Sequence, residues 1–473
     1  MSQNDELKQF EIQNDEVKIQ NDEVKIPSDE ITLDSEYYFN QLAEILSKFD
    51  FLKTTYCDQD MIGRGIPTYE FENGVSYLNL EMEYIAPFGN NKYTKCTRNC
   101  TISAYAGKAK LGDLAIQPLF DINDVDKFIL RGAYFKELTQ KPTYMHASGF
   151  MYVPSWMGLR RLPIKSRIVI DPEGYKKYQS ADKWYSKETL DHIPDELCHA
   201  TLPCLPVFSE EYKQWGEVPI DSIGEINFDE TAFDRTILPD HTKHVISNLV
   251  VNFYKTECCD FIVGKKRGLV FLLNGPPGVG KTLTAHGIAE MTHRPLYVVG
   301  AGDIGTSPDA IDKCLQRIFT MVGNWNGIVL IDEADVFMSK RTDYDVDYNA
   351  CVSVFLRLIE TYYGILFLTT NRDGNIDSAF DSRIHVRLRY DELEEDGRAL
   401  VWNESLKRYN LNNIDVNKLK TFKLNNREIA NIVQLSYISG GGNSDSVTQE
   451  TVNNFVNLRL KFTFSPSSKI TEK

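Results

Sequence analysis

The chain has 473 residues, of which 42% are hydrophobic and 25% are charged, and its formal net charge at pH 7 is −15. These proportions are ordinary for a globular protein, and the length allows about three domains. The acidic balance argues against a general affinity for nucleic acid or for an anionic membrane, because the phosphates of both would repel the protein.

Residues 1–35 are predicted to be a disordered acidic tail. The heptapeptide QNDEVKI occurs at positions 13–19 and again at 20–26, and Pro27 follows. A period of seven residues is also typical of a coiled coil. Each repeat carries too few apolar residues to sustain a coiled-coil seam, so a helix formed on a partner is kept as the alternative.

The expected location is intracellular, in the cytoplasm or the nucleus. The first residues lack the basic, apolar and small-residue regions of a signal peptide. No apolar run approaches the roughly 20 residues of a membrane-spanning helix, so no membrane span is expected. Nine scattered cysteines, an odd number, are typical of reduced thiols in a reducing compartment.

Residues 36–220 are predicted to form a mainly β (α+β) domain, since short apolar stretches alternate with turn-forming residues. These stretches include Ser76–Leu80, Cys100–Ala104, Ile129–Leu130 and Arg167–Ile170. His146 has no acidic partner near it in the sequence and is interpreted as structural.

A zinc site is the alternative to buried thiols in this region. Its ligands would be Cys96, Cys100, Cys198, His199 and Cys204. These residues lack the tightly paired spacing of structural zinc sites, so buried free thiols are the favoured interpretation.

Residues 221–391 change to strands that alternate with helices, a pattern that predicts a parallel α/β sheet. The predicted strands are Leu269–Leu273, Leu296–Val299, Ile328–Ile331, Ile365–Thr369 and His385–Leu388, and the predicted helices are Lys281–Met291, Asp309–Val322 and Ala350–Tyr362. Residues 392–473 are predicted to be helical, with breaks near Asn410 and at Gly440–Gly442.

The turn after the first of these strands matches G-x-x-x-x-G-K-[ST]. It consists of Gly275, Pro276, Pro277, Gly278, Val279, Gly280, Lys281 and Thr282, and Leu283 follows. Glycines let successive N–H groups point at phosphate oxygens, and the helix that begins here adds its positive end. Lys281 would meet the β- and γ-phosphates of ATP, and the Thr282 hydroxyl would bind Mg²⁺. A glycine-rich turn with an incidental lysine is the alternative.

Two acids follow the buried strand Ile328–Ile331, namely Asp332 and Glu333. Ligands of parallel sheets bind at the carboxyl ends of the strands. Asp332 would therefore help to hold Mg²⁺, and Glu333 would polarise the attacking water; an ordinary surface pair of acids is the alternative. Asn371, after the next strand, could orient that water.

Arg383 lies just before the last predicted strand. An arginine supplied across a subunit boundary can stabilise the charge that develops on a transferring phosphoryl group.

In this order and spacing, GPPGVGKT, LIDEAD, LTTN and SRIHV resemble the AAA subfamily of the AAA+ ATPases. Longer phrases such as GLVFLLNGPPGVGKT and NACVSVFLRLIETYYGILFLTTNR are similar to a fungal-type group of AAA proteins with an uncharacterised N-terminal domain. The segments ILRGAYF, MHASGFMYV and RIVIDPEGY resemble that domain. The resemblance covers roughly residues 75–438.

The resemblance implies Walker A roles for Lys281 and Thr282, Walker B roles for Asp332 and Glu333, and a first sensor at Asn371. It also implies a P-loop core with strand order 5-1-4-3-2, a helical lid from about residue 392, and a homo-oligomeric ring, usually of six subunits. Residues 260–262 fall where the family brackets the adenine.

Arg383 corresponds to the arginine finger of the family. The chain has only Arg383 where many members have paired arginines. The segment Gly302–Thr306 lacks the aromatic residue of protein-threading members; Ile304 is the apolar residue there that could grip a threaded chain. Arg427 corresponds either to a second sensor or to an ordinary capping or surface arginine.

The sequence therefore predicts Mg²⁺-dependent hydrolysis of ATP, coupled to remodelling of a protein client. A nucleotide-dependent switch or scaffold with little turnover is one alternative, against which Asp332, Glu333 and Asn371 argue. A nucleic-acid remodeller is another, and the net charge and the lack of a basic aromatic platform argue against it.

Overall fold

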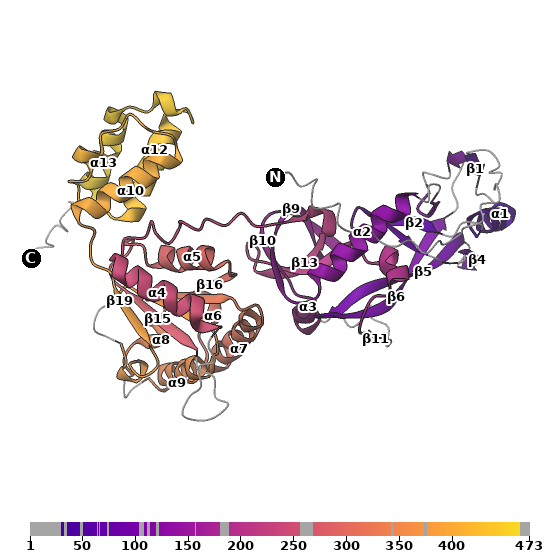
Figure 1. Ribbon diagram of the computed structural model, residues 1–473, viewed down its shortest axis with the longest axis horizontal. Helices are drawn as coiled ribbons and strands as arrows, with labels where there is room; N and C mark the ends of the chain where they lie inside the picture. The colour runs from indigo at the N-terminus through magenta and orange to yellow at the C-terminus, as the bar shows by residue number, and fades with distance from the viewer. Residues whose placement is uncertain are drawn as a thin grey trace, which may run out of the picture.

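The computed structural model describes residues 30–463 except 33–35, 48–50, 64, 66, 73–74, 104–107, 111–113, 120–122, 157, 180–188, 256–267, 342–344 and 373–375. We distinguish an N-terminal part (residues 30–224), a central part (residues 225–391) and a C-terminal helical part (residues 392–463), which Figure 1 shows as three bodies along the chain.

The N-terminal part is rich in strands. Its helices are α1 (Glu36–Leu46), α2 (Asn123–Leu138) and α3 (Pro172–Gln179). Its strands are β1 (Glu30–Thr32), β2 (Leu52–Tyr56), β3 (Gln59–Gly63), β4 (Pro67–Glu72), β5 (Val75–Gly89), β6 (Lys92–Ser103), β7 (Lys108–Lys110), β8 (Gln117–Pro118), β9 (Thr143–Ser155), β10 (Gly158–Ile170), β11 (Thr189–Leu190), β12 (Cys204–Ser209), β13 (Gln214–Pro219) and β14 (Ile223–Gly224).

Two antiparallel hairpins organise this part. The hairpin β5–β6 is the centre of a sheet with the order β11-β6-β5-β4. In the hairpin β9–β10, the strands are paired along their whole length, from Thr143 opposite Ile170 to Ser155 opposite Gly158. Strand β12 pairs with β10, β13 pairs with β12, and β13 also pairs with β9, so the four strands form a closed ring. The predicted β-rich character of this region is confirmed.

Two details of the prediction differ from the structure. Ile129 and Leu130 are not in a strand but in α2, where Val125, Phe128 and Phe135 are buried at helical spacing; a two-residue apolar run does not reveal its period. The strand β1 pairs with β7, so the predicted disordered tail is wrong at residues 30–32. Residues 1–29 lie outside the described residues.

The central part is a parallel sheet with helices on both faces (Figure 1). The sheet order is β16-β17-β18-β15-β19. Read from the β19 edge, with β15 counted as the first strand, this order is 5-1-4-3-2. Its strands are β15 (Leu269–Asn274), β16 (Leu296–Gly300), β17 (Ile328–Asp332), β18 (Ile365–Thr370) and β19 (Val386–Arg389). Its helices are α4 (Asp240–Phe253), α5 (Lys281–Thr292), α6 (Ala301–Ile304), α7 (Pro308–Asn324), α8 (Asp335–Met338) and α9 (Val346–Thr361).

The buried strands contribute to two cores, one on each face of the sheet, because successive side chains of a strand point to opposite faces. On β15, Val270 and Leu272 pack in the core that includes residues of α7 and α9. Leu269, Phe271 and Leu273 pack in the core that includes residues of α4 and α5. The predicted α/β class and strand order are therefore confirmed.

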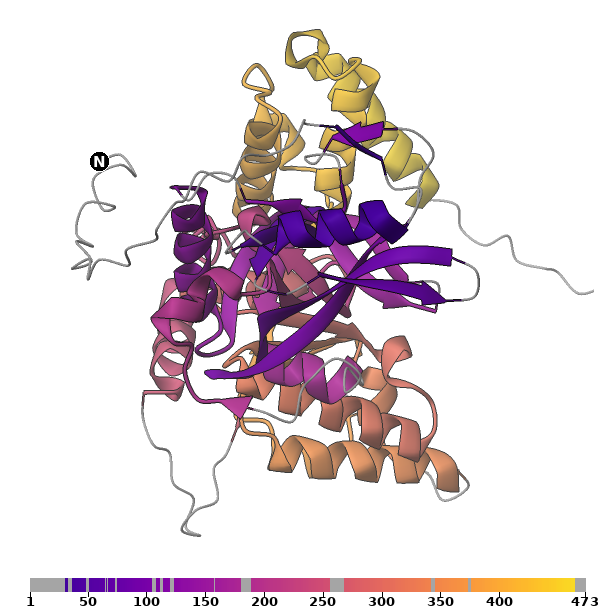
Figure 2. The same cartoon turned by 90° about the vertical axis from the view of Figure 1, so that its right-hand side faces the viewer.

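The N-terminal part packs against the central part. Val169, Phe208 and Trp215 belong to the same core as α7 and α9. The indole N–H of Trp325 donates a hydrogen bond to Asp171 across this contact, at 2.7 Å in a buried position. In the view of Figure 2 the N-terminal part stands in front of the central sheet, with the C-terminal helices above both.

The C-terminal helical part contains α10 (Glu395–Arg408), α11 (Val416–Leu419), α12 (Asn426–Ser439) and α13 (Gln449–Thr463). It has its own core, which includes Trp402, Leu419, Val433 and Val452. Within the described ranges of the chain, none of the helices has the length and apolar character needed to cross a membrane.

Candidate functional site

The glycine-rich turn is a tight loop between β15 and α5. Gly275 has φ +151°, and a Cβ added there would lie 2.2 Å from the carbonyl oxygen of Tyr390. Gly278 has φ +78°, and a Cβ added there would lie 2.6 Å from the side chain of Asn425. No larger residue fits either position, because both combine a left-handed backbone with a close neighbour. The first turn of α5 points its free N–H groups into this loop.

Lys281 is held at the centre of the loop. Its ammonium donates hydrogen bonds to the carbonyl oxygens of Gly275, at 2.7 Å, and Pro276, at 2.8 Å. A third bond, 2.8 Å long, goes to Oδ1 of Asn371. Burial lowers the pKa of Lys281; the charge of Asp332 opposes this shift and that of Arg427 adds to it. The structure thus brings Lys281 and Asn371 together, although they are far apart in the sequence.

Thr282 and the acids after β17 lie beside this lysine. The Thr282 hydroxyl is 3.4 Å from Oδ1 of Asp332, and the hydroxyl of Thr369 donates to the same oxygen. The N–H of Glu333 donates in turn to Thr369 Oγ1 at 3.0 Å. Glu333 is exposed and has φ +56°, a left-handed conformation that is uncommon for a residue with a side chain.

Sequence reasoning missed two supporting residues. Thr369 ties Asp332 and Glu333 to β18; its hydroxyl within an apolar strand is the signal that could have revealed it. The hydroxyl of Tyr390 donates to Thr284 Oγ1 at 2.8 Å, in a buried position. Tyr390 also covers Gly275. Nothing in the sequence indicated this role, since the contacts of Tyr390 with Thr284 and Gly275 depend on the pairing of β19 with β15.

Leu283 and Val279 differ in exposure. Leu283 lies in the first turn of α5 and is 50% exposed, whereas Val279 is buried in the core beneath the loop.

Residues 260–262, which the resemblance places beside the adenine, lie outside the described residues.

Arg383 does not join the other predicted site residues. Its guanidinium donates to the carbonyl oxygen of Ala379 and to Glu360, both at 2.8 Å. Parallel pairing sets Val386 beside Phe271, so Arg383 lies near the amino end of β15. At about 3.3 Å per residue, that is roughly 20 Å from the phosphate loop at the other end of the strand.

The segment Gly302–Thr306 does not present Ile304 as a residue that could grip a threaded chain. Ile304 is in α6 and is 2% exposed, so its side chain belongs to the core and does not form a gripping surface. The neighbouring Asp303 forms an ion pair with Lys213 of the N-terminal part, at 3.2 Å.

The C-terminal helical part reaches the phosphate loop through the start of α12. The N–H of Asn426 donates to the carbonyl oxygen of Gly278 at 2.9 Å. Arg427 follows in the first turn and is exposed. Its charge contributes to the pKa of Lys281, so it lies within electrostatic range of the site.

These residues fit a magnesium nucleotide. Mg²⁺ is commonly held by one or two carboxylate or hydroxyl oxygens together with water and substrate phosphates, and Thr282 and Asp332 offer such a pair. The zinc alternative has no support: Cys96, Cys100, Cys198 and Cys204 are buried free thiols. Among the residues that the structure describes, no group of three or more His, Cys, Asp or Glu side chains is arranged to hold a metal.

Comparison with known proteins finds similarity to one family in this region. The profile of the "ATPase family associated with various cellular activities (AAA)" matches residues 271–392. A Lon protease homolog of Acanthamoeba polyphaga mimivirus is 37% identical over 135 residues, 26% of this chain and 12% of that protein. The nuclear valosin-containing protein-like protein of Mus musculus is 33% identical over 166 residues, 33% of this chain and 19% of its own length.

A third relative, the human ATPase family AAA domain-containing protein 3B, is 30% identical over 142 residues, 28% of this chain and 22% of its own. The chain thus spans less than a quarter of the length of each of these relatives. Among solved structures, a chain of the Escherichia coli MS115-1 HORMA:CdnC:Trip13 complex is 18% identical with a TM-score of 0.38, covering 49% of this chain and 92% of its own.

Proposed function

We propose, from the match of residues 271–392 to the AAA ATPase family, that the protein hydrolyses ATP to ADP and phosphate in the presence of Mg²⁺. The observation that carries the proposal is the contact of Lys281 with Asn371, beside the contact of Thr282 with Asp332. Four polar groups, two from the start of α5 and one each from the ends of β17 and β18, meet at the phosphate loop, where the ligand of a parallel sheet binds.

Lys281 and the start of α5 bind the phosphates in this proposal. The lysine is buried, and its three hydrogen bonds fix the ammonium between the loop and Asn371. A cation fixed in this way interacts more strongly with phosphate than a mobile surface lysine, because water screens it less. Thr282 and Asp332 hold Mg²⁺, which offsets the negative charge of the phosphate oxygens.

Glu333 is the general base. It is exposed, so water reaches its carboxylate, and the bond from its N–H to Thr369 fixes the turn in which it lies. A carboxylate in that position accepts the proton of the attacking water. Asn371 orients the water, since its amide oxygen already faces Lys281.

Arg383 acts on the nucleotide of a neighbouring subunit. Its own phosphate loop lies roughly 20 Å away along β15, beyond the reach of an arginine side chain. We therefore propose a homo-oligomeric ring, hexameric as is usual in the family, in which Arg383 exchanges its contact with Glu360 for a neighbour's γ-phosphate.

The output of the cycle is the remodelling of a protein client or complex. The scattered thiols are the reason for proposing a cytoplasmic or nuclear location. The division of the chain into domains 36–220, 221–391 and 392–473 is also part of the proposal. The acidic net charge favours a protein client over a nucleic acid.

Steady-state release of phosphate tests the proposal. The wild-type protein should hydrolyse ATP only with Mg²⁺, and neither DNA nor RNA should stimulate it. Tight ATP binding without turnover would favour the switch or scaffold, and strong stimulation by nucleic acid would favour the nucleic-acid remodeller. No binding of ATP at all would refute the proposed function.

A further inference from the structure

The segment that joins the N-terminal part to α4, residues 225–239, lies on the helix that begins in the phosphate loop. We call it the connecting segment. Phe233 is buried against Gly287 of α5, where an added Cβ would lie 2.8 Å from its Cα. The ring of Phe228 stacks on that of His293, just beyond α5, with centroids 4.2 Å apart. The connecting segment is therefore positioned by α5.

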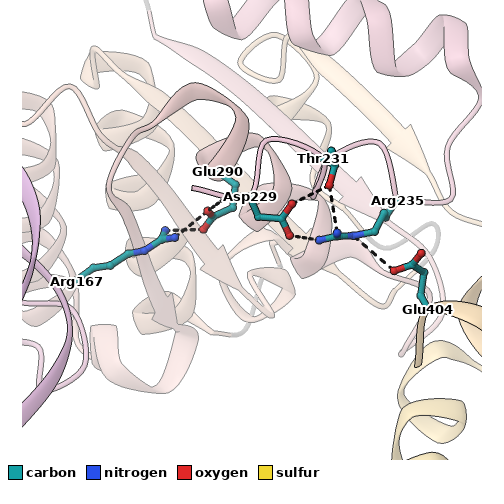
Figure 3. Close-up of polar contacts among 6 residues, drawn as sticks. All are labelled: Arg167, Asp229, Thr231, Arg235, Glu290 and Glu404. Atoms are coloured by element: carbon teal, nitrogen blue, oxygen red, sulfur yellow. Dashed lines mark hydrogen bonds and ion pairs between the residues drawn. The ribbon is translucent and has the colours of Figure 1, made fainter. Parts of the chain in front are cut away.

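Arg167 anchors the N-terminal part to the same helix. Figure 3 shows its guanidinium facing the carboxylate of Glu290 in the last turns of α5, with one bond of 2.5 Å and another of 2.8 Å. Both side chains are about three-quarters or more buried. Burial by itself would raise the pKa of Glu290, but hydrogen bonds from Arg167 and from the Asp229 N–H outweigh it, so the pKa is lowered.

This two-pronged pair is stronger than a surface ion pair, because both partners are shielded from water and the planar guanidinium matches the carboxylate. It also neutralises a negative charge near the carboxyl end of a helix, where the helix dipole disfavours one.

From Glu290 the contacts continue along the connecting segment to the C-terminal helical part (Figure 3). The N–H of Asp229 donates to Glu290 at 3.1 Å. The Asp229 carboxylate pairs with Arg235 and accepts a bond of 2.8 Å from Thr231. Arg235 in turn lies 3.9 Å from the carboxylate of Glu404 in α10. Ile237 touches α10 as well, since a Cβ added at Gly397 would lie 3.4 Å from it.

The two ends of this chain of contacts differ in strength. Arg167 and Glu290 are shielded, whereas Arg235 and Glu404 are 41% and 50% exposed and too far apart for a hydrogen bond. The weak end is therefore the one that would break first if the C-terminal helical part rotated. That part also touches the phosphate loop, through the bond from Asn426 to Gly278, so a change in its orientation would act on that loop.

We propose that Arg167, Glu290, Asp229, Arg235 and Glu404 form a coupling relay. Docking of the N-terminal part on Glu290 fixes the connecting segment, and Arg235 then holds α10 in the orientation that sets Asn426 on the phosphate loop. Arg235 and Glu290 are positioning residues, which act on the nucleotide through the C-terminal helical part. The inference rests on the proposed function for its biological output, since it assumes that this site binds ATP.

The test is a double-mutant cycle between the ends of the relay, which do not touch each other. The affinity for a non-hydrolysable ATP analogue with Mg²⁺ is measured for Arg167→Gln, Glu404→Gln and the double variant. Each single change should weaken binding about two- to five-fold, because the relay acts on the nucleotide through the exposed pair of Arg235 and Glu404, and losing one exposed ion pair is expected to have an effect of that size. The double variant should be no weaker than the poorer single variant, because either break uncouples the same relay.

Lys213→Gln is the matched control, since it breaks a different ion pair between the N-terminal and central parts. It should leave the effect of Glu404→Gln unchanged. Effects of Arg167→Gln and Glu404→Gln that simply multiply would overturn the relay. Asp229→Asn replaces Arg167→Gln in the cycle if the latter fails to fold, because Asp229 is exposed and holds Arg235 directly.

Hydrogen exchange without nucleotide separates the relay from the proposed function. Arg167→Gln or Asp229→Asn should speed exchange in α10 as well as in the connecting segment, whereas Lys213→Gln should not. Unchanged exchange in α10 refutes the relay even if ATP binds. A wild-type protein that binds no ATP refutes the proposed function, and the exchange result still decides the relay.

Discussion

Replacing Thr369 by valine should disable the site while leaving its shape almost intact. Thr369 is 1% exposed, and its hydroxyl is bonded both to the Asp332 carboxylate and to the N–H of Glu333. Valine fills the same space but offers neither a donor nor an acceptor. The change therefore acts on the orientation of the two acids and leaves the packing of β18 intact.

The expected loss follows from the two bonds. A hydrogen bond to a charged group contributes about 1.5–3 kcal/mol, and a buried N–H left unpaired costs about 1–3 kcal/mol. If only the loss of the bond to the Asp332 carboxylate affects catalysis, kcat/KM should fall about 10- to 100-fold, since each factor of ten in rate corresponds to 1.36 kcal/mol. The unpaired N–H of Glu333, in its left-handed turn, should also lower the melting temperature by several degrees.

Phosphate release and thermal unfolding measure these two effects. Thr369→Ser is the matched control, because it keeps the hydroxyl and loses only a methyl group; its kcat/KM should stay within a few-fold of wild type. If Thr369→Val keeps wild-type kcat/KM, the argument that Thr369 positions Asp332 and Glu333 is wrong.

Three further predictions concern binding, assembly and pH. Lys281→Ala should abolish tight ATP binding, because the phosphates lose their fixed cation; an unchanged equilibrium dissociation constant for a fluorescent analogue would refute the phosphate-loop assignment. Arg383→Ala and Glu333→Gln should each be nearly inactive, yet mixed rings should recover up to roughly a quarter of wild-type activity; no rescue in mixtures shown to exchange subunits would mean that Arg383 is not a finger in trans. Burial raises the pKa of Glu210 from 4.5 to about 7, so the folded state binds the extra proton in that range and stability falls as pH rises through it. Glu210→Gln should therefore raise the melting temperature at pH 8 and hardly change it at pH 5. A difference in melting temperature between variant and wild type that does not increase with pH would contradict this.

The central sheet could be predicted because its signals are local. Buried strands such as Leu269–Leu273 are short apolar runs, and the loop from Gly275 to Thr282 has a fixed pattern that needs no tertiary information. The five predicted strands agree with β15 to β19 to within two residues at each end.

Contacts between segments far apart in the chain could not be predicted in this way. The hydroxyl of Thr369 reaches Asp332 only because β17 and β18 are neighbours, and Asn426 meets Gly278 only because α12 folds back. The same applies to Arg167 and Glu290, whose pairing depends on how two parts of the chain pack. In α2, Ile129 and Leu130 were misassigned because two residues cannot distinguish a helix from a strand.

The most direct test of the central claim compares Glu333→Gln with wild type in two assays on the same preparation. Binding of a fluorescent ATP analogue reports the phosphate loop, and steady-state phosphate release reports catalysis. Glutamine keeps the shape of the side chain but cannot accept a proton from water, so binding should stay near wild type while hydrolysis slows by at least about 10²-fold. Hydrolysis at the wild-type rate would contradict the account, because the base would then lie elsewhere.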